Sequence, residues 1–523
     1  MITRRLFRLI SPRGLALGLG AVLVSALAPR APAAETGALD LGSRRELLVD
    51  TTLVAQRHGL EFLLHQPIAR ETVLTFDAPW EGSGSDFERI LRVGDVIRMY
   101  YMATVLTDAK GLKIVDENAA VYACMAVSVD GIHFVKPDLG LVDYHGSKHN
   151  NIIWTTPKLD NFTPFKDTNP NCPPDELYKA MSAGGEPRGL FALKSPDGVH
   201  WTRILDRPVI TAGMFDTQNN AFWDPVRQQY WCYIRGFHEK DGRDTTSSHH
   251  GTSGIRDIRV ATSKDFRTWT LPVQLKYPGS PDEALYTNQV EPYYRAPQLF
   301  VGFPTRYVDR PFSPAAMDAL PDPSHRRNRM KSVPRYGTVI TDGQFMTSRD
   351  GYSFHRWDET FIPPGPERDN NWIYGDGYQS LGLLETPTAD PSAPPELSCY
   401  ADEGHWKPGG TVRRYTMRVD GFASLHAKQA AGEFTTPPLT FAGAKLTLNF
   451  ATTAAGSIQV EILDADGQPI PGFGLADCDD LFGDTLNRTV TWQNRRDVSA
   501  LAGRPVRLHF TLREADLYSL KFD

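Results

Sequence analysis

Ser128-Val-Asp130-Gly-Ile-His-Phe134 is the stretch that indicates the fold, because close copies of it return along the chain. The further copies are Ser195-Pro-Asp197-Gly-Val-His-Trp201, Ser263-Lys-Asp265-Phe-Arg-Thr-Trp269 and Ser348-Arg-Asp350-Gly-Tyr-Ser-Phe354, with a weaker one at Val419-Asp420-Gly421-Phe422. An Asp-Gly pair accepts the positive φ angles of a tight turn, and the aromatic ring four residues after Asp can pack back on a sheet. Such self-similarity predicts one supersecondary unit repeated several times, with the turn aspartates in a structural role.

Five aromatic and β-branched strand cores recur in step with these turns. The cores are residues 97–102, 178–182, 230–234, 299–303 and 397–401. Five cores with their turns predict five four-stranded units, and a β-propeller is the architecture that buries such units against one another. A β-solenoid would have shorter repeats, and a pair of sandwiches would not explain the fixed order of core and turn. The sequence therefore predicts an all-β chain with a five-bladed propeller over residues 40–420, in which residues 45–50 form a strand.

The composition agrees with a globular, sheet-rich protein of two domains. The chain has 523 residues, 41% hydrophobic and 11% aromatic content, 43 glycines and 39 prolines. After Arg418 the sequence alternates apolar and polar residues, as in Lys445–Phe450 and Ser457–Ile462, which predicts a C-terminal β-sandwich over residues 421–523. A net charge of −6 gives no reason to expect nucleic acid as a partner. The oligomeric state stays open.

The N-terminus predicts export. Arg4-Arg5-Leu6-Phe7 precedes an apolar stretch from Leu15 to Leu27, and Ala31-Pro-Ala33-Ala34 suits a signal peptidase. The apolar stretch is too short for a membrane span, so no other membrane association is expected. Residues 1–34 are predicted to be a signal peptide of twin-arginine type, with an ordinary secretory signal as the alternative. The mature protein would act in the periplasm or outside the cell.

Other features yield weaker predictions. The five cysteines are scattered, so neither a disulfide framework nor a zinc site is expected, and Cys124, Cys232 and Cys399 fit buried positions. Residues 238–257 and 308–335 are long inserts that form either a surface loop or a rim over the mouth of the propeller. Calcium could sit on the axis as a structural ion, although no ligand set is visible, and no other cofactor or metal is expected.

Polar residues near the strand cores match the needs of a sugar pocket. In a propeller the innermost strands line the axial channel, and hydroxyl groups are read by carboxylates and amides while a sugar ring stacks on an indole or phenol. Glycoside cleavage also needs two carboxyl groups. The candidates for catalysis are Asp86, Asp167, Asp216, Glu291 and Glu403. The candidates for substrate binding are Trp80, Glu81, Asn219, Arg306, Asp376, His405 and Trp406.

A resemblance supports this interpretation. The chain resembles the glycoside-hydrolase-like five-bladed propellers of the arabinanase, β-xylosidase, levansucrase and invertase group, and in particular exported bacterial relatives with a C-terminal β-sandwich. It covers residues 45–523 and rests on Glu46-Leu-Leu-Val-Asp50, Asp77-Ala-Pro-Trp80-Glu81-Gly82, the Asp-Gly turns and Phe222-Trp-Asp-Pro225. The resemblance implies a glycoside hydrolase that acts on an oligo- or polysaccharide.

The resemblance also implies roles for single residues. It implies an acid in the first blade, which Asp86 fits, and an aspartate before the second core that orients substrate, which Asp167 fits. The third blade departs from the group, because Asp216 and amides stand where invertases carry Glu-Cys. The remaining acid is then Asp216, or Glu291 or Glu403 from later blades.

Two alternatives stay open. Because the expected glutamate is missing, the propeller could bind carbohydrate without cleaving it. A sialidase is the other alternative, since its Asp-box also reads Ser-x-Asp, although in this chain the Gly stands one position earlier. A sialidase needs an arginine triad for a carboxylate, which Arg235, Arg295 and Arg306 could supply.

Overall fold

The computed structural model describes residues 37–105, 121–155, 160–184, 187–245, 254–311 and 313–523. The predicted signal peptide, residues 1–34, lies outside these ranges. Within them no helix has the length and apolar character that a membrane crossing requires. All five cysteines lie in the described ranges and are free thiols, and Cys124, Cys232 and Cys399 are buried as predicted.

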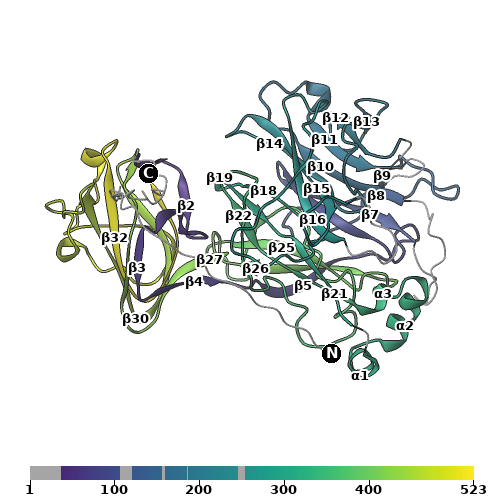
Figure 1. Cartoon of the computed structure of the whole chain (residues 1–523). Helices are drawn as coiled ribbons and strands as arrows, with labels where there is room; N and C mark the ends of the chain where they lie inside the picture. Colours follow the sequence, from purple (N-terminus) through teal and green to yellow (C-terminus); the bar gives the residue numbers. More distant parts are fainter. Residues whose placement is uncertain (1–36, 106–120, 156–159, 185–186, 246–253, 312) are drawn as a thin grey trace, which may run out of the picture. The chain divides into compact units, whose positions relative to one another are not determined.

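Five four-stranded antiparallel sheets form the propeller and confirm the predicted fold class (Figure 1). Blades 1 and 2 are β6 (Asp86–Val93), β7 (Val96–Thr104), β8 (Val121–Ser128) and β9 (Ile152–Trp154), then β10 (Asp160–Lys166), β11 (Tyr178–Ala183), β12 (Leu190–Ser195) and β13 (Thr202–Arg203). Blades 3 and 4 are β14 (Asn220–Asp224), β15 (Gln229–His238), β16 (Ile255–Ser263) and β17 (Val273–Gln274), then β18 (Glu291–Tyr293), β19 (Ala296–Gly302), β22 (Met346–Ser348) and β23 (His355–Arg356). Blade 5 is β24 (Leu384–Thr386), β25 (Glu396–Glu403), β26 (Thr411–Met417) and β5 (Ile68–Thr75).

The predicted strand cores occupy the same place in every blade. Each is the second strand of its sheet, namely β7, β11, β15, β19 or β25, and most of its side chains are buried. The last blade is completed by β5 from the N-terminal part of the chain, which pairs with β26 from Ile68 to Thr75. This pairing joins the two ends of the ring of blades and makes β5 the last strand of the blade 5 sheet.

The repeated Ser-x-Asp turn follows the third strand of blades 1 to 4. In blade 2 the Asp197 carboxylate accepts backbone N–H groups of Val199 (2.8 Å) and His200 (2.9 Å), and the Ser195 hydroxyl oxygen accepts Gly198 N–H (2.8 Å). The other three copies make the same bonds. The residue after Asp has φ of 78–81° in the three glycine copies and 62° at Phe266. The motif is therefore a structural turn.

Removing one turn aspartate should weaken the fold measurably. Asp197→Ala leaves two backbone donors without their acceptor, and we expect the free energy of unfolding to fall by about 1–2 kcal/mol. Equilibrium urea unfolding measures this change. Asp206→Ala, at an exposed aspartate on the following segment, is the matched control and should stay within about 0.5 kcal/mol of the parent. Equal stability of the two variants would contradict the structural role.

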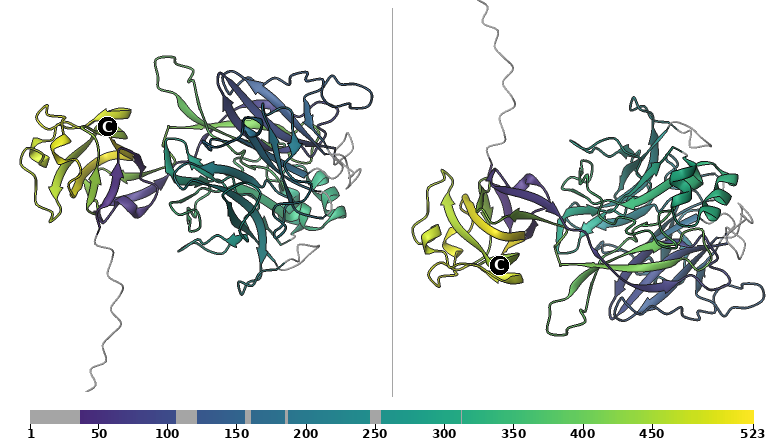
Figure 2. Two further views of the ribbon diagram at one scale, coloured as in Figure 1. Left: turned by 90° about the horizontal axis from the view of Figure 1, so that it is seen from above. Right: turned by 90° about the horizontal axis from the view of Figure 1, so that it is seen from below.

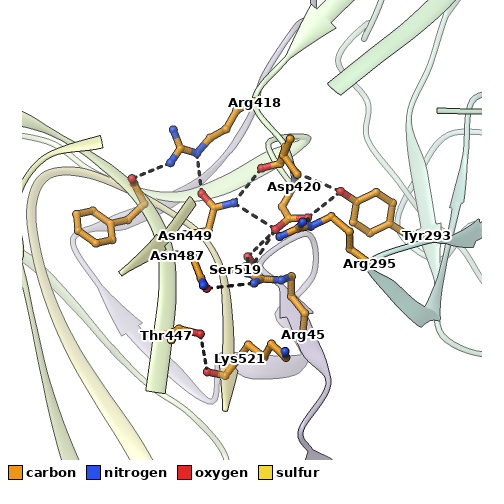
Figure 3. A network of polar contacts seen from close by, with 12 residues as sticks. Arg45, Tyr293, Arg295, Arg418, Asp420, Thr447, Asn449, Asn487, Ser519 and Lys521 are labelled. Carbon is orange, nitrogen blue, oxygen red and sulfur yellow. Dashed lines mark hydrogen bonds and ion pairs between the residues drawn. The ribbon is translucent and has the colours of Figure 1, made fainter. Parts of the chain in front are cut away.

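The fifth, weaker copy of the turn has a different function. Asp420 is fully buried and accepts hydrogen bonds from Tyr293 Oη (2.7 Å) and Arg295 Nε (2.9 Å) of blade 4 (Figure 3). Its other carboxylate oxygen accepts from Ser519 Oγ (3.1 Å) and Asn449 Nδ2 (3.2 Å) of the C-terminal sheet. Asp420 therefore connects blade 4 with the C-terminal sheet through hydrogen bonds.

The C-terminal region is one ten-stranded sheet folded around its own apolar core (Figure 2). The sheet differs from the predicted division into domains. Strands between residues 40 and 64, which were assigned to the propeller, pair in this sheet instead. The predicted strand at residues 45–50 is shorter, with Arg45–Leu47 paired to β32. Strands from the N-terminal part are β1 (Leu39–Gly42), β2 (Arg45–Leu47), β3 (Gln56–His58) and β4 (Leu60–Leu64). The others are β27 (Ala423–Ala427), β28 (Gly432–Thr435), β29 (Leu439–Phe441), β30 (Leu446–Asp464), β31 (Asp484–Thr489) and β32 (Val506–Phe522).

The insert after blade 4's second strand has structure of its own. It contains the hairpin of β20 (Thr305–Asp309) and β21 (Val339–Gly343) and three short helices that cluster together in Figures 1 and 2. These helices are α1 (Pro314–Ala319), α2 (Pro323–Ser332) and α3 (Arg335–Thr338). Proline at the first position of α1 and α2 suits a helix start, because its missing N–H would have no partner there. Of the two predicted alternatives for residues 308–335, a surface loop without structure of its own is therefore wrong.

Candidate functional site

One cavity of about 200 Å³ gathers polar and aromatic side chains from several blades. Its acidic residues are Asp86 and Asp216, and its basic residues are Arg235, Arg256 and Arg335. His405, Trp406 and three tyrosines complete much of the lining. Four of the twelve predicted residues, Asp86, Asp216, His405 and Trp406, therefore line one cavity.

Asp86 reaches the cavity from the start of the innermost strand of blade 1. Its side chain is buried, and Oδ2 lies 3.6 Å from Nδ1 of His405. The next residue, Phe87, has φ of 61°, and the cavity residues Asn161 and Trp406 also have positive φ angles. Such angles are unfavourable for side chains with a Cβ, so the surrounding packing must hold them. The cavity wall therefore concentrates strained backbone, as functional sites do.

Asp216 enters the cavity from the segment just before β14. Its side chain is 60% exposed and is ion-paired with Arg235, a buried residue of β15. Asn219 fixes this segment, because its Nδ2 donates to the carbonyl oxygens of Phe215 and Thr217, both at 2.8 Å. Asn219 is thus a positioning residue rather than a substrate contact. The ion pair stabilises the ionised carboxylate of Asp216.

His405 and Trp406 follow the second strand of blade 5. Backbone N–H of Gly404 donates to Asp376 Oδ1 at 2.9 Å, which fixes the segment that carries both rings. Burial lowers the pKa of His405 well below its usual value, and Arg329 adds to this effect. The imidazole is therefore neutral at physiological pH. Gly375 lies so close that a Cβ there would come within 2.0 Å of the His405 ring.

Three more carboxyl groups lie buried behind the cavity wall. Burial raises the pKa of Asp376 to about 7, and the charge of Glu403 adds to the shift. Burial also raises the pKa of Asp402 well above its usual value, with further contributions from Glu88 and Asp86. Glu88 has its pKa raised by burial, and its Oε2 accepts a hydrogen bond from Ser380 Oγ (2.7 Å). These groups retain protons at pH values where exposed carboxyl groups have lost theirs.

The raised pKa of Asp376 predicts a pH-dependent stability. Unfolded Asp376 loses its proton near pH 4, whereas the folded protein keeps it up to about pH 7, so this residue lowers stability as pH rises between these values. The amide of Asp376→Asn does not titrate in this range. The loss of unfolding free energy between pH 5 and pH 7.5 should therefore be smaller in the variant by about 2–3 kcal/mol. Unfolding measured at both pH values checks this. An unchanged fall in the variant would contradict the burial argument.

Aromatic rings form a continuous wall in the cavity. Tyr286 stacks on Tyr378 (centroids 5.3 Å apart), and Tyr336 stacks on Tyr374 (5.5 Å). Trp406 meets the Tyr336 ring edge-on at 4.7 Å. Tyr286 Oη donates to the backbone oxygen of Asp216 at 3.0 Å, which links this wall to the acidic segment. Rings with a polar rim suit the apolar face of a sugar.

Trp80 and Glu81 lie elsewhere and are structural. Trp80 Nε1 donates to Asn151 Oδ1 (2.9 Å), and its ring packs in the core between blades 1 and 5. Glu81 is fully buried and accepts from Tyr101 Oη (2.5 Å) and Lys136 Nζ (2.6 Å). The prediction that they line the substrate cavity is therefore wrong, because their polar atoms are occupied in blade 1.

Asp167 is also occupied by a buried partner. Its Oδ2 accepts from Lys179 Nζ (2.6 Å) and Tyr230 Oη (2.7 Å), and Lys179 is 1% exposed. It does not line the cavity, so the similarity to a substrate-orienting aspartate does not extend to its position here.

Three further candidates lie outside the cavity lining, and two of them form ion pairs. Glu291 pairs with Arg89 (2.7 Å), which joins the innermost strands of blades 4 and 1. Glu403 is held between Arg368 (2.6 Å) and Arg413 (2.7 Å). Asp376 is buried behind the wall, as described above. These three side chains therefore have structural roles.

The arginine triad considered for a sialidase does not form. Arg306 pairs with Asp342 (2.6 Å) in another cavity, and Arg295 pairs with Asp420 (2.9 Å). Only Arg235 lines the cavity of Asp86. In the parts of the chain that the structure describes, no group of three or more His, Cys, Asp or Glu residues is arranged to hold a metal ion.

Sequence reasoning missed most of the wall. Arg256, Arg335, Tyr286 and Tyr336 were not among the candidates. Arg256 comes from the third strand of blade 3, Arg335 and Tyr336 come from the insert, and Tyr286 comes from the segment between β17 and β18. The one available signal was the arginine content of residues 308–335, for which a rim over the propeller mouth was one of the two predicted alternatives.

No family model and no curated protein matches the chain. Solved structures with a similar fold include a glycoside hydrolase (12% identity, TM-score 0.42, covering 68% of this chain and 93% of the other). Another is an N-acetylgalactosamine deacetylase from F. plautii in complex with blood group B trisaccharide (13%, 0.40, 69% and 95%). A third is a family 43 arabinoxylan arabinofuranohydrolase from Bacillus subtilis in complex with cellotetraose (11%, 0.34, 85% and 96%). Likeness at this level does not extend to activity or substrate.

Proposed function

We propose that the protein is a carbohydrate-active enzyme that hydrolyses glycosidic bonds in the cavity lined by Asp86 and Asp216. The observation that carries the proposal is that two carboxyl groups from different blades line one cavity together with an aromatic wall. Glycoside hydrolysis requires this pair of groups, one to protonate the leaving oxygen and one to activate water or attack carbon. A site that only binds sugar needs the aromatic wall but not two carboxyl groups.

The surroundings of the two aspartates support different roles. Asp86 is buried beside aromatic rings and the neutral His405, where water is restricted, and it suits the proton donor. Asp216 is exposed and ion-paired with Arg235, so it stays ionised and suits the base or nucleophile. Trp406 and Tyr374 supply apolar ring faces for the sugar.

Activity on a panel of polysaccharides and oligosaccharides tests the proposal. The mature protein, from Glu35 onward, should release new reducing ends from at least one glycan, and Asp216→Asn should abolish that release. Asp206→Asn, at the exposed aspartate used above, is the matched control and should keep full activity. Tight glycan binding without any release by the parent protein would support the alternative of a non-catalytic carbohydrate-binding propeller.

We further propose that the protein is exported, because Arg4-Arg5-Leu6-Phe7 and the apolar stretch after it form a signal of twin-arginine type. Expression of the full chain in a bacterium should give a periplasmic protein that begins near Glu35. Replacing both Arg4 and Arg5 by Lys should retain the precursor in the cytoplasm. Export that persists in this variant would instead indicate an ordinary secretory signal.

A further inference from the structure

The candidate site contains more basic than acidic side chains. Arg235, Arg256 and Arg335 line the same cavity as Asp86 and Asp216, so one positive charge remains after both carboxylates are counted. A neutral sugar requires carboxylates and amides to read its hydroxyl groups, and it gives no reason for surplus guanidinium groups. The surplus positive charge therefore favours a negatively charged ligand.

Two of the arginines lie on one face of blade 3. Arg235 and Phe237 are alternate residues of β15, so their side chains point to the same face of the sheet. Arg256 of β16 is directly opposite Phe237 in the strand register. Arg235 and Arg256 therefore flank the Phe237 ring, with guanidinium carbons 5.2 and 5.4 Å from its centroid. The third arginine, Arg335, comes from the start of α3 in the insert.

Aromatic rings, rather than carboxylates, hold Arg256 and Arg335 in place. The Arg256 guanidinium lies 3.8 Å from the centroid of Tyr307, and that of Arg335 lies 4.8 Å from the centroid of Tyr336. Among the described residues neither of them has an ion-pair partner, whereas Arg259, three residues after Arg256, is paired with Asp257 (2.8 Å) and Asp244 (2.9 Å). A stacked guanidinium keeps its N–H edge available for an oxyanion.

A fourth cation lies directly behind the wall. Arg329 of α2 is 3% exposed, and its guanidinium carbon is 4.3 Å from the Trp406 ring centroid. Its Nη2 donates to the carbonyl oxygen of Tyr374 (3.0 Å), while Nε and Nη1 have no hydrogen-bond partner among the described residues. This buried charge raises the positive potential at the cavity. Asp376 lies near enough to offset part of it, and an anion in the cavity would offset it further.

We propose that the cavity binds an anionic sugar unit, whose carboxylate or sulfate is held by Arg256 and Arg335, next to the bond cleaved with Asp86 and Asp216. The inference rests on the proposed function for the position of the cleaved bond. Charge-assisted bonds from planar guanidinium groups recognise both oxyanions, because each presents two or more acceptor oxygens to the paired N–H donors. Arg235 is excluded from this role because Asp216 already occupies it.

Calorimetric binding to the Asp86→Asn variant tests the inference without turnover. The ligands are a tetrameric oligouronate, its carboxyl-reduced neutral counterpart and a sulfated neutral tetrasaccharide. We expect at least one anionic ligand to bind about tenfold more tightly than the neutral one. Comparing the oligouronate with the sulfated ligand shows whether the site prefers a carboxylate or a sulfate. Raising the salt concentration should weaken anionic binding only.

Arginine variants in the same background test the assignment of residues. Arg256→Gln with Arg335→Gln should remove the tenfold preference, while Arg504→Gln, at an exposed arginine of the C-terminal region, should leave it unchanged. Thermal unfolding shows whether the double variant is folded. If it is not, the preference of the Asp86→Asn protein for an anionic ligand over the neutral one decides the test. Equal or weaker binding of both anionic ligands, relative to the neutral one, overturns the inference. Anionic binding without hydrolysis by the parent protein would instead overturn only the proposed reaction.

Discussion

Asp86→Asn should lower the rate of glycan cleavage by roughly 10³-fold, because it removes the group that protonates the leaving oxygen. The substitution keeps the size of the side chain and removes only its acidity. Asp86 is 3% exposed and lies 3.6 Å from His405 Nδ1, so the amide should occupy the same position. Initial rates of reducing-end release, measured on the glycan that the parent protein cleaves best, give the effect.

A substrate with a good leaving group distinguishes a proton donor from other catalytic groups, because it restores activity to a variant that lacks the donor. An aryl glycoside needs little protonation of its leaving oxygen, so Asp86→Asn should keep much more of its activity on an aryl glycoside than on the natural bond. Asp216→Asn should be equally impaired on both substrates, because attack or water activation is still required. Equal loss on both substrates in Asp86→Asn would contradict the assignment of the proton donor.

Lys179→Met should lower the free energy of unfolding by about 3–5 kcal/mol, because it leaves the buried carboxylate of Asp167 without its cation, whereas Glu176 keeps its ion pair with Arg267. Lys179 Nζ lies 2.6 Å from Asp167 Oδ2 and 3.4 Å from Glu176 Oε2, and all three side chains are nearly inaccessible. Urea unfolding of the purified variant measures the loss.

The double variant separates a scaffold role of Asp167 from a catalytic one. Asp167→Asn with Lys179→Met removes both charges of the closest pair and should recover much of the lost stability. Its activity per folded molecule should match that of the parent protein. Loss of activity in a stable double variant would mean that Asp167 orients substrate, as the family resemblance implied.

The scaffold was predictable from local patterns. Each aromatic strand core became the second strand of a blade, since such a run suits a position buried on both faces, and each Ser-x-Asp motif became a turn after the third strand. Pairing between distant segments was not predictable. Residues 39–64 carry no local signal for the C-terminal sheet, and strand β5 closes blade 5 only because the ring brings its two ends together.

The site was predictable in part, for a related reason. Searching near the strand cores found Asp86, Asp216, His405 and Trp406, but also Asp167 and Glu403, whose charges are matched by Lys179 and Arg413. The sequence shows an acidic residue but not the basic residue with which it forms an ion pair in the fold. Two arginines of the wall were missed because they have no carboxylate partner: Arg256 stacks on Tyr307 and Arg335 on the adjacent Tyr336.

A crystal structure of the Asp86→Asn variant soaked with the best substrate tests the central claim most directly. We predict a glycan in the cavity, with its scissile bond between residue 86 and Asp216 and a sugar ring against Trp406. A glycan seated only elsewhere, for example on the C-terminal sheet, with this cavity holding water alone, would contradict the account.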